Sequence, residues 1–336
     1  MSSAPTAEEI ARDACWLAQA LDPAAGVVRL VAMDRDSYRA ASFLDDRLLQ
    51  QPIDAQLVPW PEIEAAVAGD LRSDARWMFH IGHVGSTLVS RLLGEIDGVL
   101  AVREPRLLRD VAVAPADIRE RYIAAVPKLM SRTFGADEIA CVKATSFASE
   151  IAPRLVPSGE SALFMFAGPQ NYVATILAGE NSVKELRALE AYRAQRLAAR
   201  GIRFGAPRND ADRAAAAWAC EMTTLEAAAD GMSDRQVEWA DFDAMLSDMA
   251  TELKRVVAHF GFAATEDRTA AIASGPLMQR YSKDPSYEYS PNLRRQLIEQ
   301  ELRLQGREID GALAMLRAAS EKSPLLARAL SRAEGN

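Results

Sequence analysis

Residues 77–93, WMFHIGHVGSTLVSRLL, combine a buried apolar run with two closely spaced glycines and two hydroxyl side chains. The run at 77–79 predicts the end of a strand. Gly82 and Gly85 allow a tight loop before an amphipathic helix that begins at Ser86. In such a strand–loop–helix unit, N–H groups of the loop and of the first helical turn face an anion, and the helix dipole favours its negative charge. The stretch therefore predicts a binding site for phosphate or sulfate.

The residue that follows Gly85 argues against a nucleotide hydrolase or a kinase. The loop of those enzymes has the pattern G-x-x-x-x-G-K-[ST], in which the lysine contacts the outer phosphates. With Gly85 as the second glycine, Ser86 occupies the lysine position and His80 the first-glycine position. A small-molecule kinase is therefore disfavoured, and an ordinary strand-to-helix turn remains the alternative to an anion site.

Two charged side chains accompany the ends of later predicted strands. Glu104 follows a strand expected over 98–102, and Lys143 lies near the end of a strand expected over 139–145. Because ligands of open α/β sheets bind where parallel strands end, we expect both side chains beside the glycine loop. There a carboxylate can accept a proton from a hydroxyl, and an ammonium can stabilise charge on a transferring group. The alternatives are a helix-start acid that interacts with the helix dipole and a lysine that extends to solvent.

Strand and helix patterns alternate between residues 77 and 180, and a further strand is expected over 236–240. The most apolar run, Ser161–Phe166, is typical of a central parallel strand that is buried on both faces. We therefore predict an α/β fold. It consists of a P-loop-type, doubly wound, mainly parallel sheet of about five strands, with helices on both faces.

The chain is expected to divide into a preface packed on the core and one larger domain. The boundaries are 1–76 for the preface and 77–336 for the domain, with a helical insertion at 181–232 and a C-terminal helix at 293–319. In the preface, apolar spacing predicts helices over 8–21 and 35–49 around a strand at 26–31. No residue of the preface has a spacing typical of catalysis, so we expect it to cap the core or to form a homodimer contact.

The composition is that of an acidic globular protein. The 336 residues include 39 Lys and Arg against 47 Asp and Glu, a net charge of −8, which argues against a general nucleic-acid partner. Three isolated cysteines and the lack of a secretory signal predict a cytoplasmic protein, and no apolar run reaches the roughly 18 residues of a membrane span. His80 and His83 have no neighbouring Cys or carboxylate, so no metal is expected.

Several features, taken in order, resemble the P-loop sulfotransferase superfamily and in particular its bacterial sulfotransferase-like proteins. They are the glycine loop at 80–87, which contains HVGST; the pair Glu104-Pro105; the strand-end Lys143; the strand-turn-helix at 164–177; and the segment 237–242, VEWADF, before a long helix that closes in HFGF. The resemblance covers about residues 77–300. It is carried more by the order of these features than by any one of them.

The resemblance implies a donor and a set of roles. The donor is 3′-phosphoadenosine 5′-phosphosulfate (PAPS), whose 5′-phosphosulfate end would be held by His83, Val84, Gly85, Ser86 and Thr87. Glu104 would be the catalytic base, and Lys143 together with His83 would stabilise the transferring group. Thr175 stands at the position of a serine that contacts the 3′-phosphate in the family.

Two departures from the family pattern concern the donor. The fourth strand of the family runs into Arg-Asp-Pro, but here the residues are Ala167-Gly168-Pro169, so the arginine that binds the 3′-phosphate is absent. A guanidinium–phosphate contact contributes about 2–3 kcal/mol, which another cation such as Arg280 or Lys283 would have to supply. In addition, His83 replaces an Arg or Lys of the loop, and an imidazole is only partly charged at neutral pH.

These observations predict a sulfotransferase that moves a sulfuryl group from PAPS to a hydroxyl or amine of a small-molecule, glycan or peptide acceptor. The alternative is a non-catalytic or altered phosphate- or nucleotide-binding member of the P-loop fold. The sequence contains no pattern that identifies the acceptor.

Overall fold

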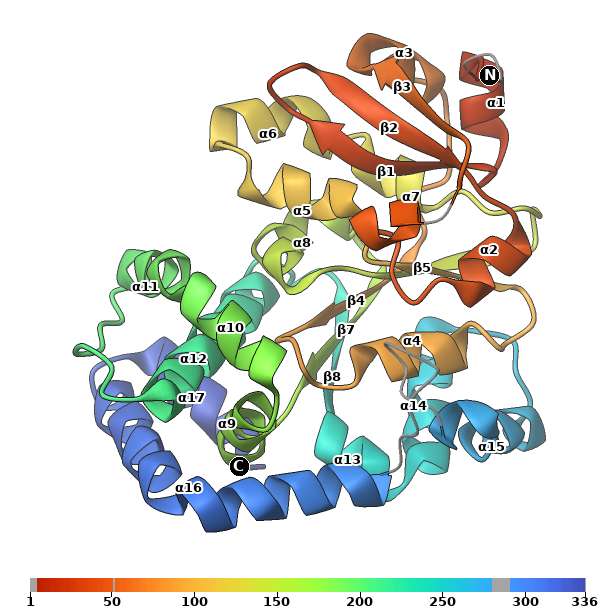
Figure 1. Cartoon of the computed structure of the whole chain (residues 1–336). Helices are drawn as coiled ribbons and strands as arrows, with labels where there is room; N and C mark the ends of the chain where they lie inside the picture. The colour runs from red at the N-terminus through yellow and green to blue at the C-terminus, as the bar shows by residue number, and fades with distance from the viewer. Residues whose placement is uncertain (1–4, 51, 280–290, 336) are drawn as a thin grey trace.

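A five-stranded, all-parallel sheet forms the centre of the computed structural model, which describes residues 5–50, 52–279 and 291–335 (Figure 1). Its strand order is β5-β6-β4-β7-β8. The strands are β4 (Arg76–His80), β5 (Val99–Arg103), β6 (Ile139–Lys143), β7 (Ser161–Phe166) and β8 (Gln236–Asp241). Every residue of β7 is buried, as its apolar sequence predicts. The predicted α/β fold class, with a parallel P-loop-type sheet, is confirmed.

The strand order creates a switch point at the carboxyl end of β4. From β4 the chain crosses to β5 at the sheet edge, returns to β6 beside β4, and then continues to β7 on the other side of β4. Ligands of such sheets bind in the crevice where the direction of winding reverses. The parallel register pairs Lys143 with Met78 of β4 and with Arg103 of β5. The residues that end these three strands therefore meet at one edge.

Helices cover both faces of the sheet. α4 (Ser86–Leu93) and α14 (Met249–Phe260) lie on one face, and α12 (Asp210–Asp230) lies on the other with α9 (Pro169–Leu177) beside it (Figure 1). Further helical elements lie outside the predicted insertion, between residues 106 and 279. They are α5 (Arg106–Val113), α6 (Ala116–Ile123), α7 (Val126–Met130), η2 (Ser146–Ile151), α8 (Ala152–Leu155), α13 (Phe242–Ser247), α15 (Glu266–Ala273) and η3 (Pro276–Gln279). Within the described ranges, no helix has the length and apolarity that a bilayer crossing requires.

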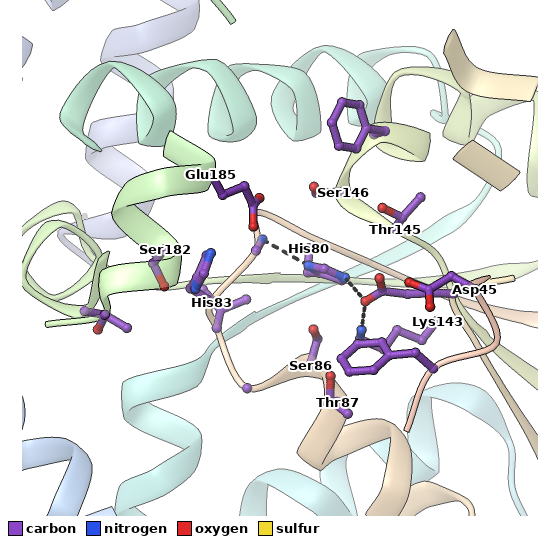
Figure 2. Close-up of a pocket in the computed structure, with 18 of the residues that line it drawn as sticks. Asp45, His80, His83, Ser86, Thr87, Lys143, Thr145, Ser146, Ser182 and Glu185 are labelled. Carbon is purple, nitrogen blue, oxygen red and sulfur yellow. Dashed lines mark hydrogen bonds and ion pairs between the residues drawn. The ribbon is translucent and has the colours of Figure 1, made fainter. Parts of the chain in front are cut away.

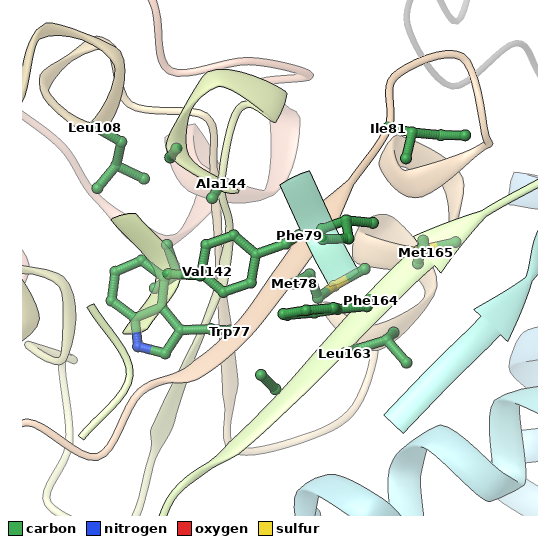
Figure 3. Close-up of a cluster of buried hydrophobic side chains, with 14 of the residues drawn as sticks. Trp77, Met78, Phe79, Ile81, Leu108, Val142, Ala144, Leu163, Phe164 and Met165 are labelled. Carbon is green, nitrogen blue, oxygen red and sulfur yellow. The ribbon is translucent and has the colours of Figure 1, made fainter. Parts of the chain in front are cut away.

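A row of aromatic rings fixes β4 against its neighbours (Figure 3). Trp77 and Phe79 stack with their centroids 6.0 Å apart, and the edge of Phe79 meets Phe164 of β7 at 5.6 Å. Phe164 in turn meets Trp239 of β8 at 5.1 Å. Trp77, Phe79 and Phe164 are fully buried. Because such rings bury large areas in defined geometries, the row holds the end of β4 in one position.

The segment expected as a helical insertion contains α10 (Glu180–Ala188), α11 (Glu190–Ala199) and α12. Trp218 of α12 donates its indole N–H to the carbonyl of Ala167 at 2.9 Å, which ties this layer to the end of β7. The expected C-terminal helix is α16 (Pro291–Ser320). A further helix, α17 (Pro324–Ala333), was not predicted; its arginines Arg328 and Arg332 pair with the buried Glu226 of α12.

The predicted helix over 8–21 is wrong. α1 (Ala7–Arg12) ends early because the Asp13 carboxylate accepts the amide N–H of Cys15 at 2.8 Å and turns the chain. β1 (Trp16–Asp22) follows, and it pairs with β2 (Val27–Ala32), which pairs with β3 (Ala55–Pro59) in an antiparallel sheet. Five consecutive residues of β1 are buried, because the strand lies between β2 and the helix α5 (Arg106–Val113).

The helix expected over 35–49 is also wrong in extent. It is divided into α2 (Arg35–Ala40) and the 3₁₀ helix η1 (Asp46–Gln50), with an irregular, bent stretch between them. α3 (Trp60–Ala66) completes the preface. Buried arginines of the core attach this region by donating to backbone carbonyls: Arg103 to Tyr38, Arg39 and Ala41, and Arg132 to Ile10 and Trp16. The preface is thus held by hydrogen bonds that leave residues 41–47 beside the end of β5.

Candidate functional site

A cavity of about 1140 Å³ opens at the carboxyl edge of the parallel sheet. It is lined by all of the site residues that the sequence predicts: His83, Val84, Gly85, Ser86, Thr87, Glu104, Lys143 and Thr175. Residues from the preface and from α16 complete its walls. The structure therefore brings together side chains that lie up to 92 positions apart between residues 83 and 175.

The glycine loop has an unusual backbone. Gly82, His83 and Gly85 adopt positive φ angles of 78°, 55° and 62°. For His83, which has a Cβ, this conformation costs about 1 kcal/mol. Gly85 precedes α4, which has no side-chain cap, so the N–H groups of its first turn have no partner within the helix. A Cβ on Gly85 would lie 1.8 Å from the ring of Phe242, so only glycine fits there.

Glu104 and Lys143 form a buried ion pair beside this loop (Figure 2). The side chain of Lys143 is 1% exposed and its Nζ contacts Oε1 of Glu104. Glu104 also has a positive φ of 54°, and its N–H donates to the carbonyl of Lys143 at 2.8 Å. Both the backbone and the side chains therefore hold the two residues together at the ends of β5 and β6.

His80 is a site residue that the sequence did not indicate. The ring is buried at the end of β4. In addition, its Nε2 lies 3.5 Å from Oε1 of Glu104, and its Nδ1 accepts the N–H of Gly82 at 3.0 Å. The one available signal was its position, because the last residue of the strand before an anion loop must face the crevice.

The charge of Glu104 is set by its neighbours. Burial alone would raise the pKa of its carboxyl, but the Lys143 ammonium and, to a smaller degree, His80 outweigh burial and hold this pKa well below its usual range. Glu104 is therefore ionised at neutral pH. While Lys143 contacts it, the carboxylate is also a weak base.

A second polar cluster lies where α9, α13 and α16 meet. Arg294 of α16 donates from Nη1 to the hydroxyl of Thr175 at 3.0 Å and from Nη2 to Asp243 at 3.0 Å. The Thr175 hydroxyl donates to the carbonyl of Asn171 at 2.6 Å. Arg294 and Thr175 both line the cavity. A guanidinium that is oriented from behind by a carboxylate is suited to bind a phosphate.

Arg294 was missed because it is 119 residues from Thr175 and its helix gives no local signal of a site. The cations that the sequence suggests as replacements for the missing arginine, Arg280 and Lys283, lie outside the described residues.

The preface also contributes to the cavity, through Phe43, Asp45, Asp46 and Arg47. The Nζ of Lys143 lies 5.3 Å from the ring centroid of Phe43, and the guanidinium of Arg47 lies 3.3 Å from the same centroid. Asp45 pairs with Arg47 through both carboxylate oxygens. No site residue was predicted in this part of the chain, since these contacts depend on how the preface folds back over β5.

In the parts of the chain that the structure describes, no three His, Cys, Asp or Glu side chains gather in a way that suits a metal ion. No family model and no curated protein matches the chain. Among solved structures, the chain is similar to a sulfotransferase domain from the curacin biosynthetic pathway, with a TM-score of 0.41 and 11% identity over 69% of this chain and 91% of that chain. It is also similar to the mouse sulfotransferase SULT7A1 complexed with PAP, with a TM-score of 0.41 and 11% identity over 78% and 90% of the two chains. At these values neither likeness identifies a function.

Gly85→Ala is expected to lower the free energy of unfolding by about 2 kcal/mol or more, because the new methyl group meets the Phe242 ring and the residue keeps its positive φ. Gly82→Ala is the matched control: its φ is also positive, but no atom lies within 4 Å of the added Cβ, so we expect a loss of about 1 kcal/mol. Urea unfolding of both variants measures the difference. Equal losses would show that Phe242 does not restrict the loop.

Lys143→Met is expected to raise the pKa of Glu104, because burial is then opposed by His80 alone. In the wild type, ionised Glu104 contributes stability above about pH 4.5, and this is lost as the pH falls further towards the folded-state pKa. The variant loses less stability over this range, because the pKa of its Glu104 is higher than in wild type, so its stability relative to wild type should increase on acidification. Carbon-13 NMR titration of the Glu104 carboxyl tests the shift; an unchanged titration would contradict the coupling.

Proposed function

We propose that the chain is a sulfotransferase that transfers the sulfuryl group of PAPS to a hydroxyl or amine of a small-molecule, glycan or peptide acceptor. The observation that carries this proposal is the contact between Glu104 and Lys143 beside the curled loop at 82–85. A base, a cation and an anion loop at one cavity are the parts that sulfuryl transfer requires.

The donor is assigned to the loop and to α16. The 5′-phosphosulfate would accept hydrogen bonds from backbone N–H groups at residues 83–87, with His83 as an additional contact. The 3′-phosphate would bind between Thr175 and Arg294, which are already joined by a hydrogen bond of 3.0 Å. In this proposal Arg294, which comes from the C-terminal helix, replaces the arginine that is absent at position 167.

The chemical step is an in-line displacement. The acceptor oxygen attacks sulfur while its proton passes to the carboxylate of Glu104. The bond between sulfur and the bridging oxygen breaks, and 3′-phosphoadenosine 5′-phosphate (PAP) leaves with the electron pair. Lys143 would turn from Glu104 towards the bridging and sulfuryl oxygens, which stabilises the leaving group and restores the basicity of Glu104.

A binding module without catalysis is the second candidate, and one feature of the resting site is compatible with it. In such a module the Glu104–Lys143 pair would be purely structural, consistent with a carboxylate whose pKa is held low. A kinase remains disfavoured because Ser86 stands where its loop requires lysine. The two candidates differ in whether PAPS is turned over.

Calorimetry with PAP tests the donor assignment. We expect micromolar binding without magnesium, and Arg294→Met should weaken it about 30- to 150-fold, the equivalent of about 2–3 kcal/mol. Arg295→Met is the matched control, since Arg295 is the exposed neighbour on the same helix and should leave binding unchanged. Absence of PAP binding, or magnesium-dependent binding of ATP in its place, would refute the assignment.

Glu104→Gln tests catalysis, because it keeps the size of the side chain and removes the base. Release of PAP from PAPS in the presence of a panel of phenols, sugars and amines should fall by about 10²-fold or more, while PAP affinity stays within about threefold. Glu266→Gln, at an exposed carboxylate on α15, serves as the control. Equal turnover in Glu104→Gln and wild type would remove Glu104 from the mechanism, and no turnover in any protein would support the binding module.

A further inference from the structure

The two ring nitrogens of His80 face two different parts of the site. Nδ1 accepts the N–H of Gly82 at 3.0 Å, and Nε2 lies 3.5 Å from Oε1 of Glu104 (Figure 2). A nitrogen that accepts an N–H carries no hydrogen itself, so the hydrogen of the neutral ring is on Nε2, the nitrogen on the side of the carboxylate. The ring is 6% exposed, so it has little freedom to rotate.

This arrangement excludes His80 as the group that takes the acceptor's proton. Its free lone pair is occupied by Gly82, and its other nitrogen already carries hydrogen. The ring instead contacts two segments with left-handed backbone: the loop that begins at Gly82, through Nδ1, and Glu104, through Nε2. Gly82 and His83 begin the loop with φ of 78° and 55°, and Glu104 has φ of 54°. Conformations of this kind persist where the surrounding contacts hold them.

We propose that His80 is a positioning residue that keeps the anion loop curled through Nδ1 and aligns the Glu104 carboxylate through Nε2, so that protonation of the ring releases the loop. The connection that His80 makes between the loop and the Glu104 carboxylate is independent of which ligand the site binds. The effect of His80 on PAP binding rests on the proposed function. A protonated ring carries hydrogen on both nitrogens. The Nδ1–H would then point at the Gly82 N–H, and the hydrogen bond would be replaced by repulsion.

Some of the charged groups around the His80 ring favour its protonation and others oppose it. The carboxylate of Glu104 favours a positive ring and the ammonium of Lys143, on the same oxygen, opposes it. Glu185 of α10 and His83 line the same cavity, and Glu185 extends towards the loop (Figure 2). An oxyanion bound in the loop adds negative charge near the ring, which favours protonation of His80. The same anion can bind only while the backbone is curled, because the loop N–H groups then point towards it. Acid conditions should therefore weaken anion binding by opening the loop.

Two substitutions separate the two nitrogens. His80→Asn places an amide oxygen near the position of Nδ1, and His80→Gln places its amide near the position of Nε2. We expect His80→Asn to keep PAP affinity within about threefold of wild type at neutral pH and His80→Gln to lose about tenfold or more. Between about pH 8 and pH 5, wild-type affinity should fall more steeply than that of His80→Asn, which cannot titrate there. Protonation of PAP itself affects both profiles equally, so a difference between the two profiles reports on His80.

The nitrogen-15 spectrum of the imidazoles gives a readout that needs neither PAP nor turnover. The chain has three histidines, so His83→Asn and His259→Asn variants assign the signals of His80. An unprotonated Nδ1 with a protonated Nε2 at neutral pH supports the proposal, as does a lower protection factor of the Gly82 amide hydrogen in acid, measured as its exchange rate relative to the intrinsic rate at the same pH.

A protonated Nδ1 at neutral pH, equal PAP affinity of the Asn and Gln variants, or parallel pH profiles of wild type and His80→Asn would each overturn the role of His80. If no protein binds PAP, the proposed function fails, and the imidazole spectrum and the Gly82 exchange still decide the role of His80. The same two measurements decide it if either variant does not fold.

Discussion

The site depends on one constraint: the charge of Lys143 is buried and has to be balanced where it lies. With 1% of its side chain exposed, an isolated ammonium would be strongly destabilising. Glu104 provides the balance because β5 and β6 are adjacent parallel strands in register, with Arg103 opposite Lys143. The residue after β5 consequently projects beside the residue that ends β6. The left-handed backbone of Glu104 turns its side chain back towards that ammonium.

The same contact creates a conflict with catalysis. A carboxylate that is stabilised by an ammonium and an imidazole is a poor proton acceptor, and this is the resting state of Glu104. In the proposed reaction the donor resolves the conflict, since negative charge that develops on the leaving group draws Lys143 away. Glu104 would therefore become a stronger proton acceptor once the donor is bound, because Lys143 no longer contacts its carboxylate. Until then the ion pair keeps the cavity near electrical balance and prevents an isolated buried charge.

Local pattern predicted the sheet well and the walls of the cavity poorly. β7 is predicted with its exact bounds because the five apolar residues that follow Ser161 are typical of a central strand buried on both faces. Glu104 and Lys143 could be selected because parallel strands end at one edge. The helix over 8–21 failed because Ile10, Leu17 and Leu21 fit a helical period by coincidence, whereas the Asp13 turn and pairing with β2 decided the structure. His80, Arg294 and Phe43 act through contacts between distant segments, and a single sequence does not encode which segments meet.

The attachment of the preface determines one wall of the cavity. Arg103 is 2% exposed and donates to carbonyls of residues 38–41, while its own carbonyl accepts the N–H of Leu44 at 2.7 Å. Burial lowers the pKa of this guanidinium to about 9, so the carbonyl bonds are its main compensation. Arg103 directly precedes Glu104, and the segment that it holds carries Phe43 to within 5.3 Å of Lys143. The end of β5 thus positions both the carboxylate and the cavity wall that carries Phe43, so a change in the preface that shifts Phe43 would alter this wall while the cluster around Arg294 stays in place.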